Sequence, residues 1–354
     1  MKILSLELKN YRNIENLKIF PSEEMNLIYG ENAQGKTNLI EAIWLFTGAK
    51  SFRGNKDEAL IKFEFKKAEC KLKFLSEGIE KEAEILIEDK RKAFLNEKKL
   101  KTASLLAGNF NAIVFSPIDL KIVSEGPSVR RRFLDTAIGQ LYPSYIEILK
   151  GYVRAVTQRN KIIKDFKYDS TVSVLLDVFE KEIAEKGLKI IKYRNKYIEI
   201  LSEFLPDLYK GISDGKEELK MEYIKSFEGE NLEEILKEKR KEDIFTSTTS
   251  VGPHRDDLEF KINGISARNF GSQGQKRSVA LSLKLAEAEV IRKNTGESPI
   301  CLLDDVMSEL DPSRQNFILN HIKGMQTFLT CCDPESVKNL KVGKLFNIKN
   351  GGVL

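Results

Sequence analysis

Hydrophobic positions follow two different spacings along the chain, and the changes between them predict its secondary structure. The short apolar run Met25–Tyr29 ends at Gly30, and Leu39, Ile43 and Phe46 then follow at helical spacing. A short apolar run that ends at a glycine and precedes a helical pattern is typical of a buried strand leading through a loop into a helix. We therefore predict a strand–loop–helix unit near the N-terminus.

Between residues 59 and 100 the apolar positions recur at every second residue, which indicates half-buried strands. Ser76-Glu77-Gly78 separates two of the runs and has the composition of a tight turn. The alternating positions are Ile61, Phe63 and Phe65, then Cys70, Leu72 and Phe74, then Ala83, Ile85 and Ile87. This pattern predicts an antiparallel meander.

From about residue 128 to residue 210 the spacing is helical. Pro143 and Asp169-Ser170 divide the pattern into separate helices. The positions at i+3/i+4 spacing are Ile146, Leu149, Val153, Val156 and Ile163, then Leu176, Phe179, Ile183, Ile190, Tyr197, Leu201 and Phe204. They predict a mostly helical insert that is too short to form a long coiled coil.

Strands return after residue 245, where Phe260 and Ile262 lead into the hairpin signal Asn263-Gly264 and Ile300–Leu303 forms another apolar run. We predict an α/β head built from both ends of the chain, with an antiparallel β subdomain and an inserted helical arm. The predicted division is 1–125 for the N-terminal part of the head, 126–244 for the arm and 245–354 for the C-terminal part of the head.

The composition is ordinary for a soluble globular protein, with 41% hydrophobic and 31% charged residues in 354. The formal net charge of +5 allows an anionic partner without requiring one. No apolar run reaches 18 residues, so we predict no membrane-spanning helix. The four cysteines and two histidines lack zinc-site spacing, and we expect a reducing, cytoplasmic location.

A complete GxxxxGK[ST] motif follows the first predicted strand. Its residues are Gly30, Glu31, Asn32, Ala33, Gln34, Gly35, Lys36 and Thr37. The glycines let backbone N–H groups turn toward phosphates, Lys36 reaches the β- and γ-phosphates, and Thr37 supplies a hydroxyl to Mg²⁺. The alternative, a surface turn, does not explain the strand before the motif and the helix after it. We therefore predict an ATP-binding loop.

A second candidate site follows the apolar run Ile300–Leu303, which ends in Asp304 and Asp305. This is the Walker B pattern, in which Asp304 holds Mg²⁺ through water and Asp305 orients or deprotonates the attacking water. Alone, the pattern equally fits a strand followed by a solvated acidic turn. Together with the phosphate loop, it favours ATP and Mg²⁺ binding, with Lys36, Asp304 and Asp305 as the catalytic set.

Ser272, Gly274 and Gln275 open a helical pattern about 30 residues before Walker B. They fit an ordinary helix cap, or an anion site at a helix N-terminus. Their position matches the signature motif of ABC-type ATPases, which covers the γ-phosphate held by a second subunit. Asp311 then occupies the position of the D-loop, another dimer-interface element. No histidine follows Thr330, where that class places a switch residue.

Several blocks, taken in order, resemble the RecF family of bacterial recombination-repair proteins from end to end. The blocks are Lys9–Asn13, Phe115–Pro117, Gly126-Pro127, Arg130–Asp135, Val251–Asp257, Phe270–Arg277 and Leu302–Asp311. Ile118 and Glu125 depart from the family pattern, in the surroundings of the arm.

The resemblance implies an ABC-type ATPase head, related to SMC proteins, that binds ATP and Mg²⁺ and dimerises on ATP. It also implies binding to double-stranded DNA and to single-strand/double-strand junctions, and slow hydrolysis of ATP. The implied partners are RecO and RecR, with which the protein directs RecA, and no membrane is involved. By the same resemblance, Arg12 approaches the nucleotide. Most ABC ATPases carry Glu at the position of Asp305, whose shorter side chain fits slow turnover.

The DNA-contacting surface is less defined by the sequence. One candidate is the run Arg130, Arg131 and Arg132, and another is Arg53 with Lys56. The arginine run could equally form a solvated helix face or hold the arm to the head. Two other functions remain as alternatives: an ATPase subunit of a transporter, and a P-loop kinase of small molecules, which has no use for Ser272.

Overall fold

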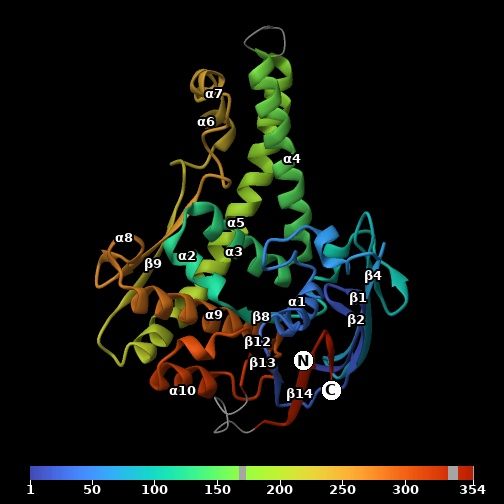
Figure 1. Cartoon of the computed structure of the whole chain (residues 1–354). Coiled ribbons are helices and arrows are strands. Elements are labelled where there is room, and N and C mark those ends of the chain that lie inside the picture. Colours follow the sequence, from blue (N-terminus) through green and yellow to red (C-terminus); the bar gives the residue numbers. More distant parts are fainter. Residues whose placement is uncertain (167–172, 334–341, 354) are drawn as a thin grey trace.

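The computed structural model describes residues 1–166, 173–333 and 342–353. Its centre is a six-stranded sheet in the order β15-β14-β3-β13-β12-β8, in which all neighbours are parallel except β15 and β14. The strands are β3 (Met25–Tyr29), β8 (Ala112–Phe115), β12 (Ile300–Leu303), β13 (Thr327–Cys331), β14 (Lys344–Lys349) and β15 (Gly352–Val353). The predicted head built from both ends of the chain is confirmed, because β3 lies between β14 and β13 (Figure 1).

A second sheet is antiparallel and has the order β2-β1-β4-β5-β6-β7. Its strands are β1 (Lys2–Tyr11), β2 (Ile14–Ile19), β4 (Ala68–Ser76), β5 (Ile79–Ile87), β6 (Lys92–Leu95) and β7 (Lys98–Lys99). The predicted meander and its turn are confirmed, and Glu77 and Gly78 both have the positive φ values of a type I′ turn. The predicted strand through Ile61, Phe63 and Phe65 is wrong. A 3₁₀ turn, Asp57–Leu60, precedes these residues, and Phe63 is 87% exposed.

The arm rises from the head as two long antiparallel helices, α4 and α5 (Figure 1). The helices of this region are α2 (Leu120–Ser124), α3 (Pro127–Leu141), α4 (Pro143–Phe166), α5 (Ser173–Ile212), α6 (Leu232–Glu238) and α7 (Arg240–Thr246). The predicted helical insert and the break at Pro143 are confirmed, whereas Asp169-Ser170 lies outside the described residues. Within the described part of the chain, no helix is long and apolar enough to cross a membrane.

A three-stranded sheet, β11-β10-β9, joins the end of the arm region to the C-terminal part of the head. Its strands are β9 (Leu219–Ile224), β10 (Asp257–Ile262) and β11 (Ile265–Ser266), and the predicted hairpin at Asn263-Gly264 connects the last two. The remaining helices are α1 (Lys36–Leu45), α8 (Ala267–Phe270), α9 (Gln273–Thr295) and α10 (Pro312–His321). The predicted arm boundary at 244/245 therefore separates two paired strands, β9 and β10.

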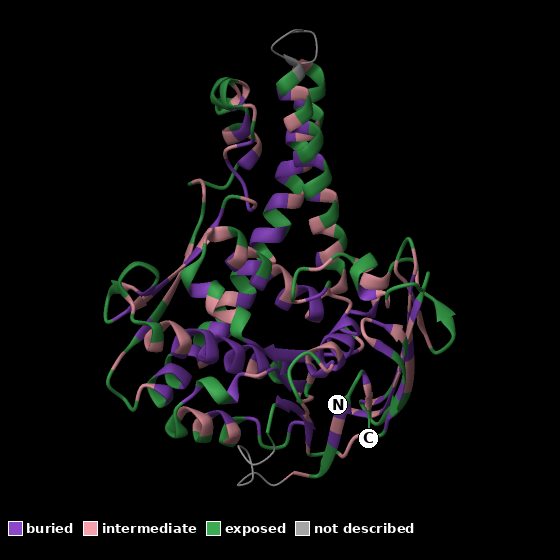
Figure 2. Cartoon of the chain, in the orientation of Figure 1, coloured by how far each residue is buried: buried purple, intermediate pink, exposed green. Residues whose placement is uncertain are grey.

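Two hydrophobic cores lie on opposite faces of the central sheet. Ile28 and Leu302 point into one core, shared with α1 and the antiparallel sheet, while Leu27 and Leu303 point into the other, shared with α9 and the arm. Successive side chains of a strand point to opposite faces, so both faces of β3 and β12 are covered. Buried residues accordingly fill the centre of the head in Figure 2. The phosphate loop is thereby held on a rigid layer.

His254 lies in a segment that connects the arm to the head, and its surroundings hold it neutral. Its Nε2 lies 3.1 Å from the carbonyl of Thr249, which only accepts, so Nε2 carries the proton. Its Nδ1 then accepts from the hydroxyl of Tyr152 at 2.6 Å. Burial lowers the pKa of His254 to about 4, and Arg255 and Arg131 act in the same direction. These contacts give His254 a structural role.

We expect His254 to make the fold acid-sensitive. Its pKa is about 4 in the folded chain and about 6.5 when unfolded, so only the unfolded chain takes up this proton in between. Stability is full above pH 6.5 and falls by up to about 1.4 kcal/mol per pH unit as the pH drops toward 4. Chemical denaturation of the wild type and of His254→Gln across this range measures the effect.

Burial of Asp119 raises its pKa to about 6 and acts in the opposite direction over the same range. Because both proteins carry Asp119, its contribution cancels in the difference between them. The stability advantage of the wild type over His254→Gln should therefore shrink from pH 6.5 to pH 4. A difference that stays constant with pH would show that His254 takes up its proton equally in the folded and the unfolded chain, which contradicts a lowered pKa.

Candidate nucleotide-binding site

The phosphate loop runs from the end of β3 to the start of α1, and both of its glycines are required. A Cβ on Gly30 would lie 2.3 Å from the carbonyl oxygen of Ile348, and one on Gly35 would lie 2.8 Å from Oδ1 of Asn13. Their φ values of +149° and +114° also lie where side chains are strained. The sequence therefore selects glycine for close packing as well as for the curvature of the loop.

Two segments far from the loop in sequence hold it in shape. Asn13 donates through Nδ2 to the carbonyl of Gln34 at 2.9 Å and accepts from Nδ2 of Asn38 at 2.8 Å. The side chain of Gln34 accepts from the backbone N–H of Asn350 at 2.6 Å. Sequence reasoning did not assign these roles to Asn13 or Asn350. The only signal was the presence of Asn13 in the Lys9–Asn13 block.

Lys36 is buried and lies within the curve of the loop. Its Nζ donates to the carbonyls of Gly30 and Glu31, at 2.7 and 3.0 Å, and lies 3.6 Å from Sγ of Cys332. Cys332 in turn donates to Oδ1 of Asn32 at 3.0 Å. The ammonium group is thus already placed at the loop, where phosphate oxygens can replace its neutral acceptors with charged ones.

The Walker B acids lie beside the first helical turn after the loop. The Thr37 hydroxyl donates to Oδ1 of Asp304 at 2.8 Å, and the Thr330 hydroxyl lies 3.1 Å from the same oxygen. Burial raises the pKa of Asp304, and both hydroxyls act against this rise. The backbone N–H of Asp305 donates to the Thr330 hydroxyl at 2.9 Å. The structure thus brings Thr37, Asp304 and Asp305 together, as the two motifs predict.

The oxygens of Thr37 and Asp304 fit a magnesium ion in chemical type. Mg²⁺ prefers hard oxygen ligands and is usually held by one or two protein groups together with water and substrate phosphates. The carboxylate and hydroxyl of this site are such groups, already within 2.8 Å of each other. Within the described residues, no cluster of three or more His, Cys, Asp or Glu offers another metal site.

Arg12 lies next to the phosphate loop region but is held by a buried acid. Its Nε and one terminal nitrogen each donate at 2.9 Å to the carboxylate of Glu41, and its other terminal nitrogen donates to the carbonyl of Ala59. Glu41 is fully buried and also accepts from Tyr11 and Ser51. In this structure, therefore, the guanidinium group binds the middle of α1 through Glu41, and its approach to nucleotide stays a prediction.

The signature residues stand at the start of α9, as the sequence predicts. Ser272 caps the helix: its Oγ accepts from the N–H of Gln275, and Oε1 of Gln275 accepts from the N–H of Ser272. Asp311 caps α10 in the same manner, accepting from the N–H of Arg314 at 3.0 Å. Arg314 also donates from Nε to Ser278 of α9, so the signature and the D-loop form one surface.

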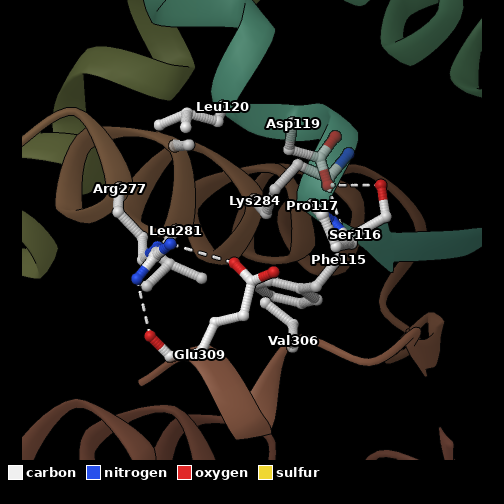
Figure 3. Close-up of a pocket in the computed structure, with 11 residues that line it drawn as sticks. Phe115, Ser116, Pro117, Asp119, Leu120, Arg277, Leu281, Lys284, Val306 and Glu309 are labelled. Carbon is white, nitrogen blue, oxygen red and sulfur yellow. Dashed lines mark hydrogen bonds and ion pairs between the residues drawn. The ribbon is translucent and has the colours of Figure 1, made fainter. Parts of the chain in front are cut away.

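A second link joins the signature helix to the segment after Walker B. Arg277 donates to the backbone carbonyl and the side chain of Glu309, at 2.6 and 2.9 Å (Figure 3). These two residues line a small pocket together with Asp119, whose carboxylate accepts from the N–H of Ser116 at 2.7 Å. The pocket therefore connects the end of β8, α9 and the segment after β12. No sequence motif predicted this pocket.

The candidate DNA residues fall into two groups in the structure. Arg130 is 2% exposed and forms a bidentate ion pair with Asp257, so its side chain does not face solvent here and its role as a DNA contact stays a prediction. Arg132 is exposed and donates to the carbonyl of Ser51, which brings it beside the exposed Arg53. The remaining candidates are placed as follows: Arg131 is half-buried and donates to the carbonyl of Asp256, and Lys56 is exposed.

The comparisons with known proteins agree over the whole chain. A family model described as the RecF/RecN/SMC N terminal domain matches residues 2–351. The DNA replication and repair protein RecF of Lachnoclostridium phytofermentans is 40% identical over 357 residues, covering 100% of this chain and 99% of that protein. The protein of the same name from Bacillus mycoides is 40% identical over 368 residues, with 100% and 98% covered.

Solved structures give the same result. The recombination mediator protein RecF-ATP in the RecFOR pathway is 37% identical and superimposes with a TM-score of 0.93, covering 100% of this chain and 97% of that one. The Smc head domain from Pyrococcus yayanosii, at 14% identity and a TM-score of 0.57, shares the fold, covering 99% and 96% of the two chains. This chain belongs to the RecF family and has its ABC-type ATPase fold.

Proposed function

We propose that this protein is an ATP-driven dimerisation switch that holds double-stranded DNA during recombinational repair. The observation that carries the proposal is the separation of two half-sites within one chain. Ser272 and Gly274 border a surface hollow with Asp311 and Arg314, and no residue of the phosphate loop borders that hollow. Ser272 itself is exposed. A second copy is the natural way to bring a signature surface to the phosphate loop.

In the proposed cycle, Lys36 and the loop N–H groups bind the phosphates of ATP. Thr37 and Asp304 would hold a magnesium ion, whose chemistry is to neutralise charge on the phosphates. Ser272 of a second copy then closes on the γ-phosphate, which only the triphosphate supplies. Asp305 orients the attacking water, and loss of the γ-phosphate removes the contact that both copies share, so the dimer opens.

We propose that DNA lies against the surface formed by Arg132, Arg53 and Lys56. Arg132 and Arg53 come from distant parts of the sequence and lie beside each other at the base of the arm. The RecF relatives are named for DNA replication and repair, and the solved relatives for the RecFOR pathway. We extend this to action with RecO and RecR, near single-strand gaps, in directing RecA. Removing each contacting cation should flatten the salt dependence of DNA affinity.

Sedimentation with Mg-ATP, with Mg-ADP and without nucleotide tests the switch. The wild type should form a dimer only with ATP, and Ser272→Arg should bind ATP yet remain a monomer. Thr157→Arg, which adds the same charge to an exposed position of the arm, is the matched control and should dimerise. A wild type that binds ATP but stays a monomer in all conditions contradicts the switch and favours the P-loop kinase alternative.

Asp305→Glu should raise the rate of ATP hydrolysis by roughly tenfold. The backbone of Asp305 is fixed by Thr330, so the length of the side chain decides how far its carboxylate reaches toward the water. An extra methylene extends that reach by over about 1 Å, a displacement that strongly affects a positioned reaction. Turnover at saturating ATP and Mg²⁺ measures the effect, with Asp305→Asn as the inactive reference. An unchanged or lower rate would show that the length of the Asp305 side chain is not the cause of slow turnover.

A further inference from the structure

Thr330 ends β13 and contacts both Walker B acids with one buried hydroxyl. The hydroxyl lies 3.1 Å from Oδ1 of Asp304 and 2.9 Å from the backbone nitrogen of Asp305, and the residue is 1% exposed. A hydroxyl has one donor and two acceptor positions. It therefore donates to the Asp304 carboxylate and accepts from the Asp305 N–H at the same time. The carbonyl of Leu303, at 3.5 Å, is the more distant acceptor.

We infer that Thr330 is a positioning residue for the ATPase reaction, fixing the metal-side acid and the water-side acid relative to each other. This inference rests on the proposed function. Asp305 has a φ of +52°, in the left-handed region where the backbone of a non-glycine residue is strained. The hydrogen bond from its N–H to Thr330 opposes that strain. The direction in which the Asp305 side chain leaves the backbone thus depends on Thr330.

The position of β13 in the sheet explains how one residue acts on the whole site. β13 lies between β3, which leads into the phosphate loop, and β12, which carries the acids. Thr330 pairs in register with Ile28 of β3, two residues before Gly30. Oδ1 of Asp304 also accepts from Thr37, so a single carboxylate oxygen joins α1, β12 and β13. Such outer contacts orient a metal-binding carboxylate and tune its affinity.

The same strand end approaches the loop itself through Cys332. Its Sγ contacts Asn32 and lies 3.6 Å from Nζ of Lys36. Thr330 and Cys332 thus touch the acid side and the phosphate side of the site from one short segment. The sequence carries no histidine at this strand end, and the threonine hydroxyl provides a polar link from β13 to both acids. We assign the positioning role to Thr330 because its bonds reach the reacting groups through one buried atom.

The test compares Thr330→Val and Thr330→Ser with Thr327→Val. Thr327 is an ideal control, since it is equally buried on the same strand but its hydroxyl donates to the carbonyl of Met325. Mn²⁺ affinity is measured by electron paramagnetic resonance with a non-hydrolysable ATP analogue bound. We expect Thr330→Val to weaken Mn²⁺ binding about tenfold, with serine restoring it and Thr327→Val leaving it unchanged.

Steady-state kinetics supplies a second readout, in which Thr330→Val should lower kcat about tenfold and leave KM for ATP within about twofold. Equal Mn²⁺ affinity and kcat for Thr330→Val and Thr327→Val would overturn the inference while leaving the proposed function intact. A wild type that binds neither the analogue nor Mn²⁺ would overturn both. If Thr330→Val fails to fold, Thr330→Ala against Thr327→Ala gives the same comparison.

Discussion

Replacing Lys36 with methionine should weaken ATP binding by about a hundredfold and abolish ATP-dependent dimerisation. In the structure, Nζ of Lys36 is buried in the phosphate loop and donates to the carbonyls of Gly30 and Glu31. The negatively charged oxygens of a phosphate would accept charge-assisted hydrogen bonds from this ammonium group, each contributing about 1.5–3 kcal/mol to binding. Methionine keeps the length and apolar stem of the side chain, so the variant removes the charge with little change in packing.

Isothermal titration with ATP in the presence of Mg²⁺ measures the loss, and sedimentation measures dimerisation on the same samples. Lys50→Met is the matched control. Lys50 follows α1 and is exposed, and in the described part of the chain it makes no hydrogen bond to the phosphate loop. The control should bind ATP as the wild type does. An affinity of Lys36→Met within a few-fold of the wild type would contradict the location of the phosphate site.

Replacing Arg159 with methionine should destabilise the arm by about 3–5 kcal/mol. Arg159 is fully buried and forms ion pairs with Glu180, at 2.8 Å, and Asp243, at 2.6 Å, both of which are also fully buried. It further donates to the hydroxyl of Thr249 at 3.0 Å. Removing the cation leaves the buried carboxylate of Asp243 without its ion pair, while Glu180 keeps its ion pair with Arg240. Breaking a buried pair from one side is strongly destabilising. The pairs link α4, α5 and α7 into one unit.

Urea unfolding followed by circular dichroism at 222 nm measures this effect, because the arm holds the longest helices of the chain. Arg154→Met is the matched control on the same helix, since Arg154 is exposed. It should change the unfolding free energy by no more than about 0.5 kcal/mol. A loss for Arg159→Met that equals the loss for Arg154→Met would show that the buried network contributes little net stability.

The parts of the fold that the sequence predicted are those fixed by neighbouring residues. The strand Met25–Tyr29 agrees residue for residue, and Ser272 caps α9 as expected, because burial pattern and capping are local properties. The false strand at Ile61–Phe65 has the right alternation. However, β4 takes the place beside β1, and this segment keeps only an isolated antiparallel bridge between Ile61 and Tyr11. Which strand becomes a neighbour depends on pairing across long sequence separations, which alternation does not encode.

The arginine residues show the same limit for the candidate site. Arg130 and Arg159 look like parts of solvated basic faces when only their helices are considered. In the fold, Asp257 and Asp243 reach them from 127 and 84 residues away, and both arginines are buried. The chemistry of the phosphate loop and Walker B was predictable because each motif is contiguous. The contacts that Asn13, Asn350 and Thr330 make with these motifs were not predictable, because these residues are close to the motifs only in the folded chain.

The closure of the phosphate loop by distant residues has a consequence for protein synthesis. Gly30 packs against Ile348, and Gln34 accepts from Asn350, so the ribosome translates more than 300 residues between the loop and its supports. During that interval β3 also lacks its partners β13 and β14. A nascent chain therefore carries the ATP-binding motif long before it can bind ATP. Incomplete chains that are released early would therefore not pair with finished copies. They would leave the half-sites of those copies free.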